Sequence, residues 1–163
     1  MINILYKYKG YIMIKDKSFS AYILPVRSDG RVALLQYGEN GFGTIGGRLD
    51  DGEDFITALK RELIEELGGI TADLADVAVA VSVPYSFKHP NIVRAEKRGA
   101  WNEEHHFFVA KMPNNTDLRF CENRPEKISV VWIEPKELLN PTVTPFEDMR
   151  QYYEQYIIPL LQF

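Results

Sequence analysis

The sequence contains one cysteine, Cys121, which excludes an internal disulfide framework and a zinc site built from several cysteines. It has no apolar run long enough to span a bilayer. The net charge of −4, without clustered Lys and Arg, argues against long nucleic acid or a membrane surface as a partner. We therefore expect a reduced, cytoplasmic setting and a small-molecule partner.

Repeats, linkers and low-complexity segments are also absent. A length of 163 residues with 45% hydrophobic residues suits one domain spanning residues 1–163. The apolar N-terminal stretch is interrupted by Lys7, Lys9 and Gly10, and no small-residue cleavage site follows it. We expect residues 1–19 to form a strand or arm rather than a signal peptide.

The first half of the chain predicts strands and a glycine-rich loop before a helix. Residues 21–26 and 31–36 are β-rich runs joined by Ser28, Asp29 and Gly30, which predicts a β-hairpin. Residues 38–47 contain five glycines, a composition typical of a loop that approaches a ligand.

The second half predicts further strands and a C-terminal helix. Residues 76–87 and 104–111 are β-like, and the polar residues 88–103 between them predict a long functional loop. A strand is expected at Ile128–Ile133, followed by a helical turn at Pro135–Leu139. Residues 144–147 match a capping box that opens a helix ending near Leu161.

An amphipathic helix is predicted between the two halves. Phe55, Leu59, Leu63 and Leu67 recur every four residues, which is the spacing of one apolar helix face. Acidic residues before Phe55 favour the helix start, and the Gly68-Gly69 pair favours its end.

Three glutamates share a patch of this helix. Glu62, Glu65 and Glu66 stand at i, i+3 and i+4, so their carboxylates gather beside the apolar stripe. Like charges this close repel unless a cation compensates them. Mg²⁺ takes oxygen ligands and leaves positions for water and phosphate oxygens, so the cluster predicts a magnesium site for phosphate chemistry. An exposed, solvated helix face is the alternative.

The flanks of the cluster favour the metal site. Together with the cluster they form the spaced series Gly47, Glu53, Arg61, Glu62, Leu63, Glu65, Glu66 and Gly68. This series resembles the signature of the Nudix hydrolase superfamily, in which the position of Leu63 is aliphatic and the other seven are fixed. Seven fixed positions would match by accident with a probability on the order of 10⁻⁸ per window. Two positions depart from the common pattern, with Gly69 at the closing aliphatic position and Ile45 where many members have Pro.

The resemblance implies an α/β fold, a Nudix-type α/β/α sandwich with a mixed β-sheet between helices. It also implies Mg²⁺-dependent hydrolysis of a phosphoanhydride bond, by water attack on phosphorus, in a nucleoside diphosphate linked to another moiety. Mn²⁺ is expected to substitute. The expected metal ligands are Glu62, Glu65, Glu66 and a backbone carbonyl at Gly47 or its neighbour Gly46.

Further catalytic residues are expected around these ligands. By the resemblance, Arg61 and Glu53 hold the loop against the helix and orient the ligand carboxylates. The general base is a carboxylate of the helix cluster or one outside it, either Glu104 (or its neighbour Glu103) or Glu126. A surface ion pair is the alternative role for Arg61 and Glu53, and a solvated side chain is the alternative for each outside candidate.

Substrate contacts are expected from Arg48 and from the aromatic rings of Tyr37, Phe42 and Tyr85, which are suited to stacking on a base. Ordinary core packing is the alternative for these rings and for Phe87 and Trp101. His105 and His106 are neighbours in a predicted strand, so they point to opposite faces and do not chelate one metal together. We expect one to face the core or cleft and the other to face water, and leave His89 unassigned.

A nucleoside triphosphate or similar small nucleotide is the expected substrate. Nucleotide-sugar, ADP-ribose and dinucleoside-polyphosphate hydrolysis are alternatives, because Pro84 and Tyr85 together match the hints for two of these classes. A non-catalytic nucleotide-sensing module of the same fold is the alternative of another class. A monomer or homodimer is expected.

Overall fold

A mixed β-sheet forms the centre of this computed structural model, which describes residues 3–7, 10–39, 41–68, 71–112, 118–121 and 127–161, with side chains from residue 14 onward. Strands β2 (Gly10–Val26) and β8 (Ala100–Lys111) run parallel along its middle, paired from Lys15↔Ala100 to Val26↔Lys111. The other strand pairs are antiparallel.

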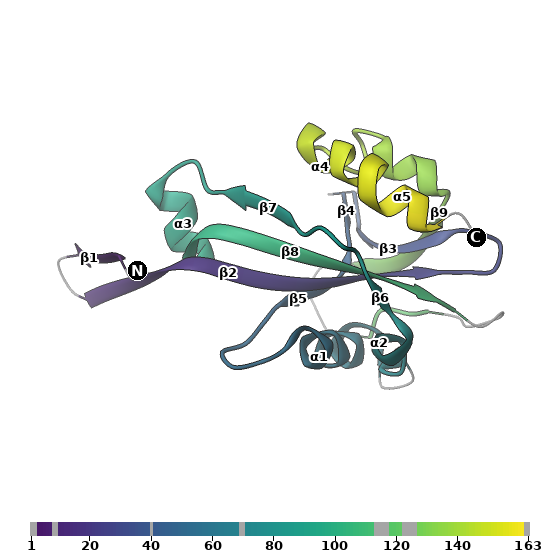
Figure 1. The fold of residues 1–163 in the computed structure, drawn as a ribbon, viewed down its shortest axis with the longest axis horizontal. Coiled ribbons are helices and arrows are strands. Elements are labelled where there is room, and N and C mark those ends of the chain that lie inside the picture. Colours follow the sequence, from purple (N-terminus) through teal and green to yellow (C-terminus); the bar gives the residue numbers. More distant parts are fainter. Residues whose placement is uncertain are drawn as a thin grey trace.

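Helices cover both faces of this sheet (Figure 1). Helices α1 (Phe55–Leu67) and α2 (Leu74–Val77) lie on one face, against a core that includes Ala21, Ile23 and Phe108. The C-terminal helix lies on the other face, against a core that includes Leu24 and Phe107. The alternation of side chains along β2 and β8 supplies one core to each face. The predicted α/β/α sandwich is confirmed.

The predicted hairpin is formed only at its turn. Gly30 has a positive φ of 82°, and Arg27 and Arg31 are joined by a 2.9 Å backbone hydrogen bond. Beyond Val26↔Val32, however, β3 (Val32–Tyr37) leaves β2 and pairs with β9 (Ile128–Ile133). Strand β2 pairs instead with β5 (Ile45–Arg48), so the prediction of a local hairpin was wrong beyond the turn.

Two predicted loops contain regular structure. The glycine-rich residues 38–47 include β4 (Phe42–Gly43) and most of β5. Residues 88–103 are not a long loop, because they contain helix α3 (Ile92–Arg98), which Asn91 caps at its start and Gly99 ends with a φ of 70°. Residues 76–87 form the end of α2, then β6 (Val79–Ala80) and β7 (Tyr85–Lys88), rather than one strand.

The ends of the chain combine confirmed and corrected predictions. Strand β1 (Asn3–Lys7) pairs with the start of β2. The turn η2 (Pro135–Leu139) is present, and the C-terminal helix runs through α4 (Glu147–Tyr152), the π-type segment η3 (Tyr153–Ile157) and α5 (Ile158–Leu161). The expected capping box is not formed, because α4 has no side-chain cap and the carbonyls of Thr144 and Pro145 accept hydrogen bonds from Arg150. No described helix has the length and apolarity that a bilayer crossing requires.

Candidate active site

The orientation of helix α1 is fixed by a cap at its start and by its buried apolar face. Asp54 accepts a hydrogen bond from the backbone N–H of Thr57 at 2.7 Å, which caps the helix start. Leu59 and Leu63 are fully buried against the sheet. With this face buried, the charged positions of α1 point toward β5 and toward the segment that connects β5 to α1. The predicted carboxylate cluster lies there.

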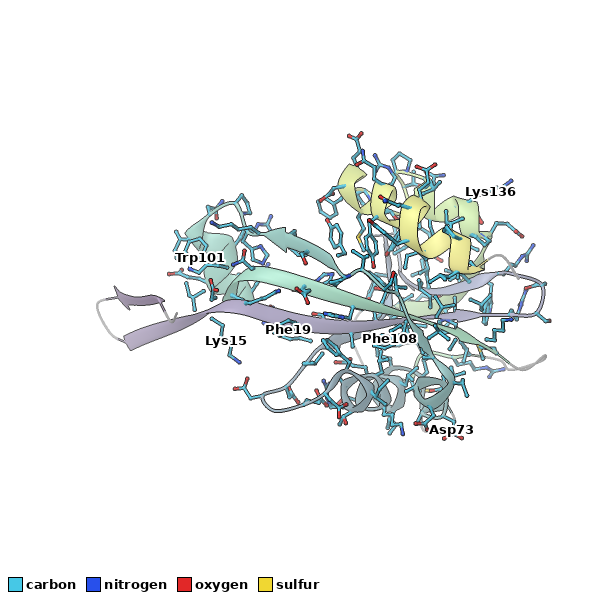
Figure 2. The ribbon with its side chains drawn as sticks, viewed as in Figure 1. Lys15, Phe19, Asp73, Trp101, Phe108 and Lys136 are labelled. Atoms are coloured by element: carbon cyan, nitrogen blue, oxygen red, sulfur yellow. The ribbon has the colours of Figure 1, made fainter. Side chains whose placement is uncertain are left out.

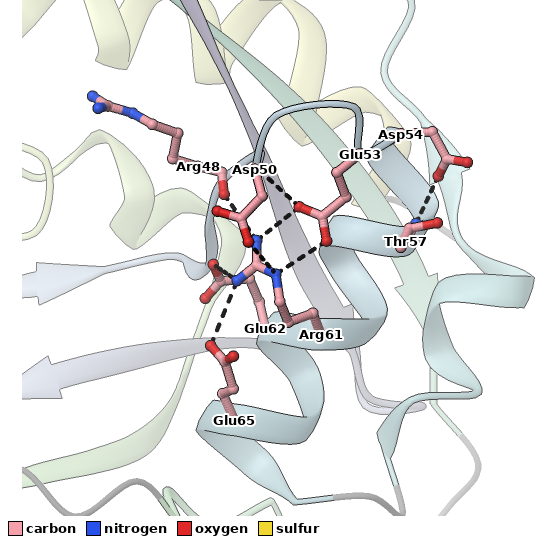
Figure 3. Close-up of polar contacts among 8 residues, drawn as sticks. All are labelled: Arg48, Asp50, Glu53, Asp54, Thr57, Arg61, Glu62 and Glu65. Carbon is pink, nitrogen blue, oxygen red and sulfur yellow. Dashed lines mark hydrogen bonds and ion pairs between the residues drawn. The ribbon is translucent and has the colours of Figure 1, made fainter. Parts of the chain in front are cut away.

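Arg61 contacts several residues of the cluster (Figure 3). Its Nε and Nη2 donate to the two carboxylate oxygens of Glu53 at 3.0 and 2.9 Å, a bidentate pair. Glu53 also accepts from the backbone N–H of Asp50, 2.9 Å away. Hydrogen bonding to Arg61 and then to Asp50 holds the pKa of Glu53 below its usual value, so Glu53 is ionised at neutral pH. The loop is thereby fastened to the helix, as expected.

Arg61 also contacts two of the predicted metal ligands. Nη1 donates to Glu62 at 2.7 Å and lies 3.5 Å from a carboxylate oxygen of Glu65. Nη2 donates to the backbone carbonyl of Arg48 at 2.9 Å. One guanidinium therefore links the loop, the helix and strand β5, which explains why a point charge on a flexible stem, such as Lys, would not replace it.

Two glycines of β5 bring the strand against the helix carboxylates. The backbone N–H of Gly46 donates to Glu66 at 2.9 Å, and Glu66 is only 4% exposed. A Cβ placed on Gly47 would stand 2.3 Å from Oε1 of Glu62. Glu62 and Glu66 thus meet the same two-residue stretch of backbone, which needs glycine to allow the approach.

The donor chemistry of this stretch fits a hard divalent cation. Within the described residues, no three His, Cys, Asp or Glu side chains converge closely enough to form a cage by themselves. Arg61 contacts two of the three glutamates, Glu62 at 2.7 Å and Glu65, whose side chain is 51% exposed, at 3.5 Å. Mg²⁺ needs only one or two protein carboxylates beside water and phosphate oxygens. Glu62 and Glu66, both ending at β5, meet that requirement.

Glu104 and Glu126 are candidate bases that lie outside helix α1. Glu104 on β8 forms an ion pair with Lys17 and accepts a hydrogen bond from His106 at 2.7 Å. The contact with Lys17 is the main cause that lowers the pKa of Glu104. Desolvation opposes this shift, and the hydrogen bond from His106 adds to it. Glu126 lies outside the described residues.

The adjacent histidines point to opposite faces of β8, as expected. His105 donates toward Glu103 on the face of the C-terminal helix, with 3.0 Å between the two atoms. His106 lies on the α1 face, where its ring centroid is 4.0 Å from that of Phe55. His106 is the more exposed of the two, with 25% of its side chain exposed against 12% for His105.

The aromatic substrate candidates are not gathered on one face. Tyr37 packs against the core under α1, and its ring covers Gly43. Phe42 lines a cavity of about 140 Å³ beside Pro145 and Tyr153, on the opposite face. Tyr85, also on that face, donates a 2.7 Å hydrogen bond to Asp148 of α4. Burial and then the Asp148 contact raise the pKa of Tyr85.

Sequence reasoning missed the surroundings of Glu103. This buried carboxylate contacts Arg98 of α3, His89 after β7, and Arg48 at the end of β5. Asn91 and Gly99 are residue types that begin and end helices, and they are the sequence signal that could have indicated α3 and with it Arg98.

Comparison with known proteins identifies relatives. A family model described as NUDIX domain matches residues 17–156. An RNA pyrophosphohydrolase from Erythrobacter litoralis is 31% identical over 115 residues, which are 68% of this chain and 68% of that protein. One from Dinoroseobacter shibae is 31% identical over 114 residues, 67% of this chain and 68% of its own length.

Solved structures show the same fold. The E. coli dihydroneopterin triphosphate pyrophosphohydrolase has a TM-score of 0.64 at 18% identity, over 90% of this chain and 99% of that one. A MutT protein from Methanosarcina mazei Go1 has a TM-score of 0.62 at 19% identity, over 86% of this chain and 93% of that one.

Proposed function

Because this chain belongs to the NUDIX domain family, we propose that helix α1 and the Gly46–Gly47 stretch of β5 form the active site of its pyrophosphohydrolase activity. The enzyme hydrolyses a phosphoanhydride bond in a nucleotide-linked substrate. Nudix hydrolases generally use divalent metals. The ion used here is proposed to be Mg²⁺, with Mn²⁺ as a substitute.

The observation that carries the proposal is the meeting of Glu62 and Glu66 at the two glycines. Oε2 of Glu66 lies 2.9 Å from the Gly46 nitrogen, and Glu62 occupies the space that a side chain at residue 47 would fill. These two carboxylates, with Glu65 beside them and a carbonyl of Gly47, would hold the cation. When bound, the cation offsets the charge of the phosphate oxygens and increases the acidity of the attacking water.

The protein residues around this point orient the parts of the reaction. Arg61 fixes Glu62, and Glu53 fixes Arg61 through its bidentate contact. Glu104, ionised at neutral pH, is proposed as the base that accepts the proton of the attacking water.

The substrate is proposed to be a nucleoside triphosphate or similar small nucleotide. The 5′-triphosphate end of RNA is the second candidate, because the two relatives that are 31% identical are RNA pyrophosphohydrolases. The single-domain boundary, the cytoplasmic setting and the monomeric or homodimeric state stay predictions.

Turnover of a substrate panel tests the proposal. Nucleoside triphosphates, a dinucleoside polyphosphate, ADP-ribose, a nucleotide sugar and a 5′-triphosphate RNA oligonucleotide are incubated with protein and Mg²⁺, or with chelator. We expect hydrolysis only with the cation, and loss of it in Glu66→Gln. Glu154→Gln, which removes an exposed glutamate of the C-terminal helix, is the matched control. Undiminished hydrolysis in chelator would refute the metal site.

A further inference from the structure

Glu103 is the most completely buried carboxylate among the described residues, and its contacts come from four separate parts of the chain. Its side chain is 0% exposed. Arg98 donates from Nε at 2.9 Å and from Nη2 at 3.3 Å. His89 and His105 contact the two carboxylate oxygens at 2.8 and 3.0 Å. Arg48 completes the group, 3.5 Å away.

These contacts keep Glu103 charged. Burial alone would raise the pKa of its carboxyl, but hydrogen bonds from His105, Arg98 and His89 lower it far below the usual value. A buried charge is tolerated when it is paired and hydrogen-bonded, and Arg98 alone already supplies a two-point contact. The second guanidinium, from Arg48, is therefore more than Glu103 requires.

The surplus positive charge faces outward. Two guanidiniums around one carboxylate leave one unit of positive charge, before either histidine is protonated. The side chains of Arg48 and Arg98 are 41% and 48% exposed, whereas that of Glu103 is 0% exposed. The 3.5 Å contact of Arg48 is long, which leaves much of its hydrogen-bonding capacity for a ligand.

Buried polar atoms without a partner lie on the same strands. Among the described residues, Oγ of Ser18, Nε1 of Trp101 and Nδ1 of His105 are buried with no hydrogen bond. Ser18 is 7% exposed and is paired in register with Glu103, while Trp101 and His105 flank Glu103 at alternate positions of β8.

The cluster is connected to the proposed active site through Arg48. Arg48 follows Gly47 directly in β5, and its carbonyl accepts a hydrogen bond from Arg61. Figure 3 shows the Arg48 side chain pointing away from Arg61, Glu62 and Glu65. Figure 2 shows Trp101 beside α3, on the other side of the sheet from Asp73 in the α1–α2 layer. The backbone of Arg48 thus belongs to the proposed active site, and its side chain belongs to the Glu103 cluster.

We propose that Arg48 and Arg98, held in place by Glu103, form a phosphate-binding site for an anionic group of the substrate beyond the anhydride that is cleaved. Glu103 engages Nε and Nη2 of Arg98, so Arg98 offers its remaining N–H groups to a ligand, and Arg48 offers most of its guanidinium. Guanidinium groups suit phosphate oxygens, and two of them at one place favour an anion over a neutral sugar. Arg98 and Arg48 act as binding residues, and Glu103 acts as their positioning residue. The kinetic part of this inference rests on the proposed function.

Binding of inorganic phosphate in chelator tests the site without any turnover. The acidic helix repels phosphate when no cation is present, so the basic site is measured alone. We expect Arg98→Gln to weaken phosphate binding about tenfold or more, the effect of losing a hydrogen bond to a charged group. Lys97→Gln, which removes the neighbouring exposed charge of α3, should stay within about twofold of wild type by the same measure.

The Arg98→Lys variant is the control for loss of folding, because it keeps a cation beside Glu103 and removes only the planar guanidinium group. Its melting temperature should stay near that of wild type, and its phosphate affinity should fall between those of wild type and Arg98→Gln. Equal phosphate binding by wild type, Arg98→Gln and Arg98→Lys would overturn the site. So would an equal loss in Lys97→Gln.

Kinetics with two substrates then connect the site to the reaction. For a nucleoside triphosphate, Arg98→Gln should raise KM about fivefold or more. For a nucleoside diphosphate joined to a neutral hexose, KM should change less than about twofold, because that substrate lacks the anionic group. Equal changes for both substrates would overturn the substrate role. If wild type hydrolyses neither substrate, the proposed function fails, and the phosphate titration still decides the binding site.

Discussion

Gly46 donates its backbone N–H to the carboxylate of Glu66 at 2.9 Å, joining residues 20 apart in the chain. The bond uses one oxygen of a carboxylate that is 4% exposed. The same carboxylate is a proposed metal ligand, so strand position and ligand orientation are coupled. Substitutions at Gly46 and Gly47 test the strand position and the ligand orientation separately.

Gly46→Ala should destabilise the fold. Gly46 has a φ of 124°, and a Cβ there would lie 2.2 Å from the carbonyl oxygen of Ala21, a backbone atom that does not rotate away. Gly30→Ala is the matched control, because it has a φ of 82° but nothing within 4 Å of the added Cβ. Backbone strain alone costs about 1–3 kcal/mol. Thermal unfolding should therefore show a clearly larger loss for Gly46→Ala, and equal losses would contradict the clash.

Gly47→Ala should impair metal use more than stability. The added Cβ would meet Oε1 of Glu62 at 2.3 Å, and a flexible side chain can yield where backbone cannot. Displacing one proposed ligand should raise the Mg²⁺ concentration for half-maximal turnover by about 10-fold or more. A Mg²⁺ titration of activity checks this. An unchanged half-maximal concentration would remove Glu62 from the ligand set.

The part of the site on α1 could be predicted because its determinants are local. The apolar repeat from Phe55 to Leu67, the cap at Asp54 and the charge spacing all lie within one helix and its start. Gly46 and Gly47 were expected to lie in a loop, because their pairing partners Tyr22 and Ala21 are distant in sequence. Short-range patterns do not specify which strand a segment joins.

The contacts of Glu103 could not be predicted from sequence patterns. Its four partners come from residues 48 to 105, and the contacts exist only once β5, β7, α3 and β8 are assembled. Helix α3 itself was missed because Ala95 alone is buried, which leaves no apolar stripe.

Lys17→Gln should shift the acid limb of the pH profile upward. The Lys17 contact is the largest cause of the lowered pKa of Glu104, so removing it raises that pKa. If Glu104 is the base, kcat/KM of the variant should fall at a higher pH than that of wild type. Glu104→Gln should lower kcat about 100-fold or more. A Glu104→Gln variant within a few-fold of wild type would place the base elsewhere.

Arg61→Lys should weaken the metal site while keeping its charge. Lys cannot reproduce the two contacts to Glu53 together with those to Glu62 and the Arg48 carbonyl. Orienting partners of metal ligands typically matter by about 10–100-fold in affinity or activity. Arg94→Lys, on the exposed face of α3, is the control. Equal Mg²⁺ affinity in both variants, measured by titration, would contradict the orienting role.

Glu103→Gln should remove an acid-sensitive part of the stability. The folded-state pKa of Glu103 is depressed below its ordinary 4.5, because its hydrogen bonds from His105, Arg98 and His89 outweigh burial. A depressed pKa contributes stability that is present above the unfolded pKa and is lost as pH falls through the folded one. Near neutral pH the wild type should therefore melt at a higher temperature than Glu103→Gln. As pH falls below about 4.5, the difference should shrink, since protonation of Glu103 also produces a neutral group at that position. Melting curves of both proteins from neutral to acid pH give the comparison. A difference that stays constant over that range would show that Glu103 acts through packing and not through its charge.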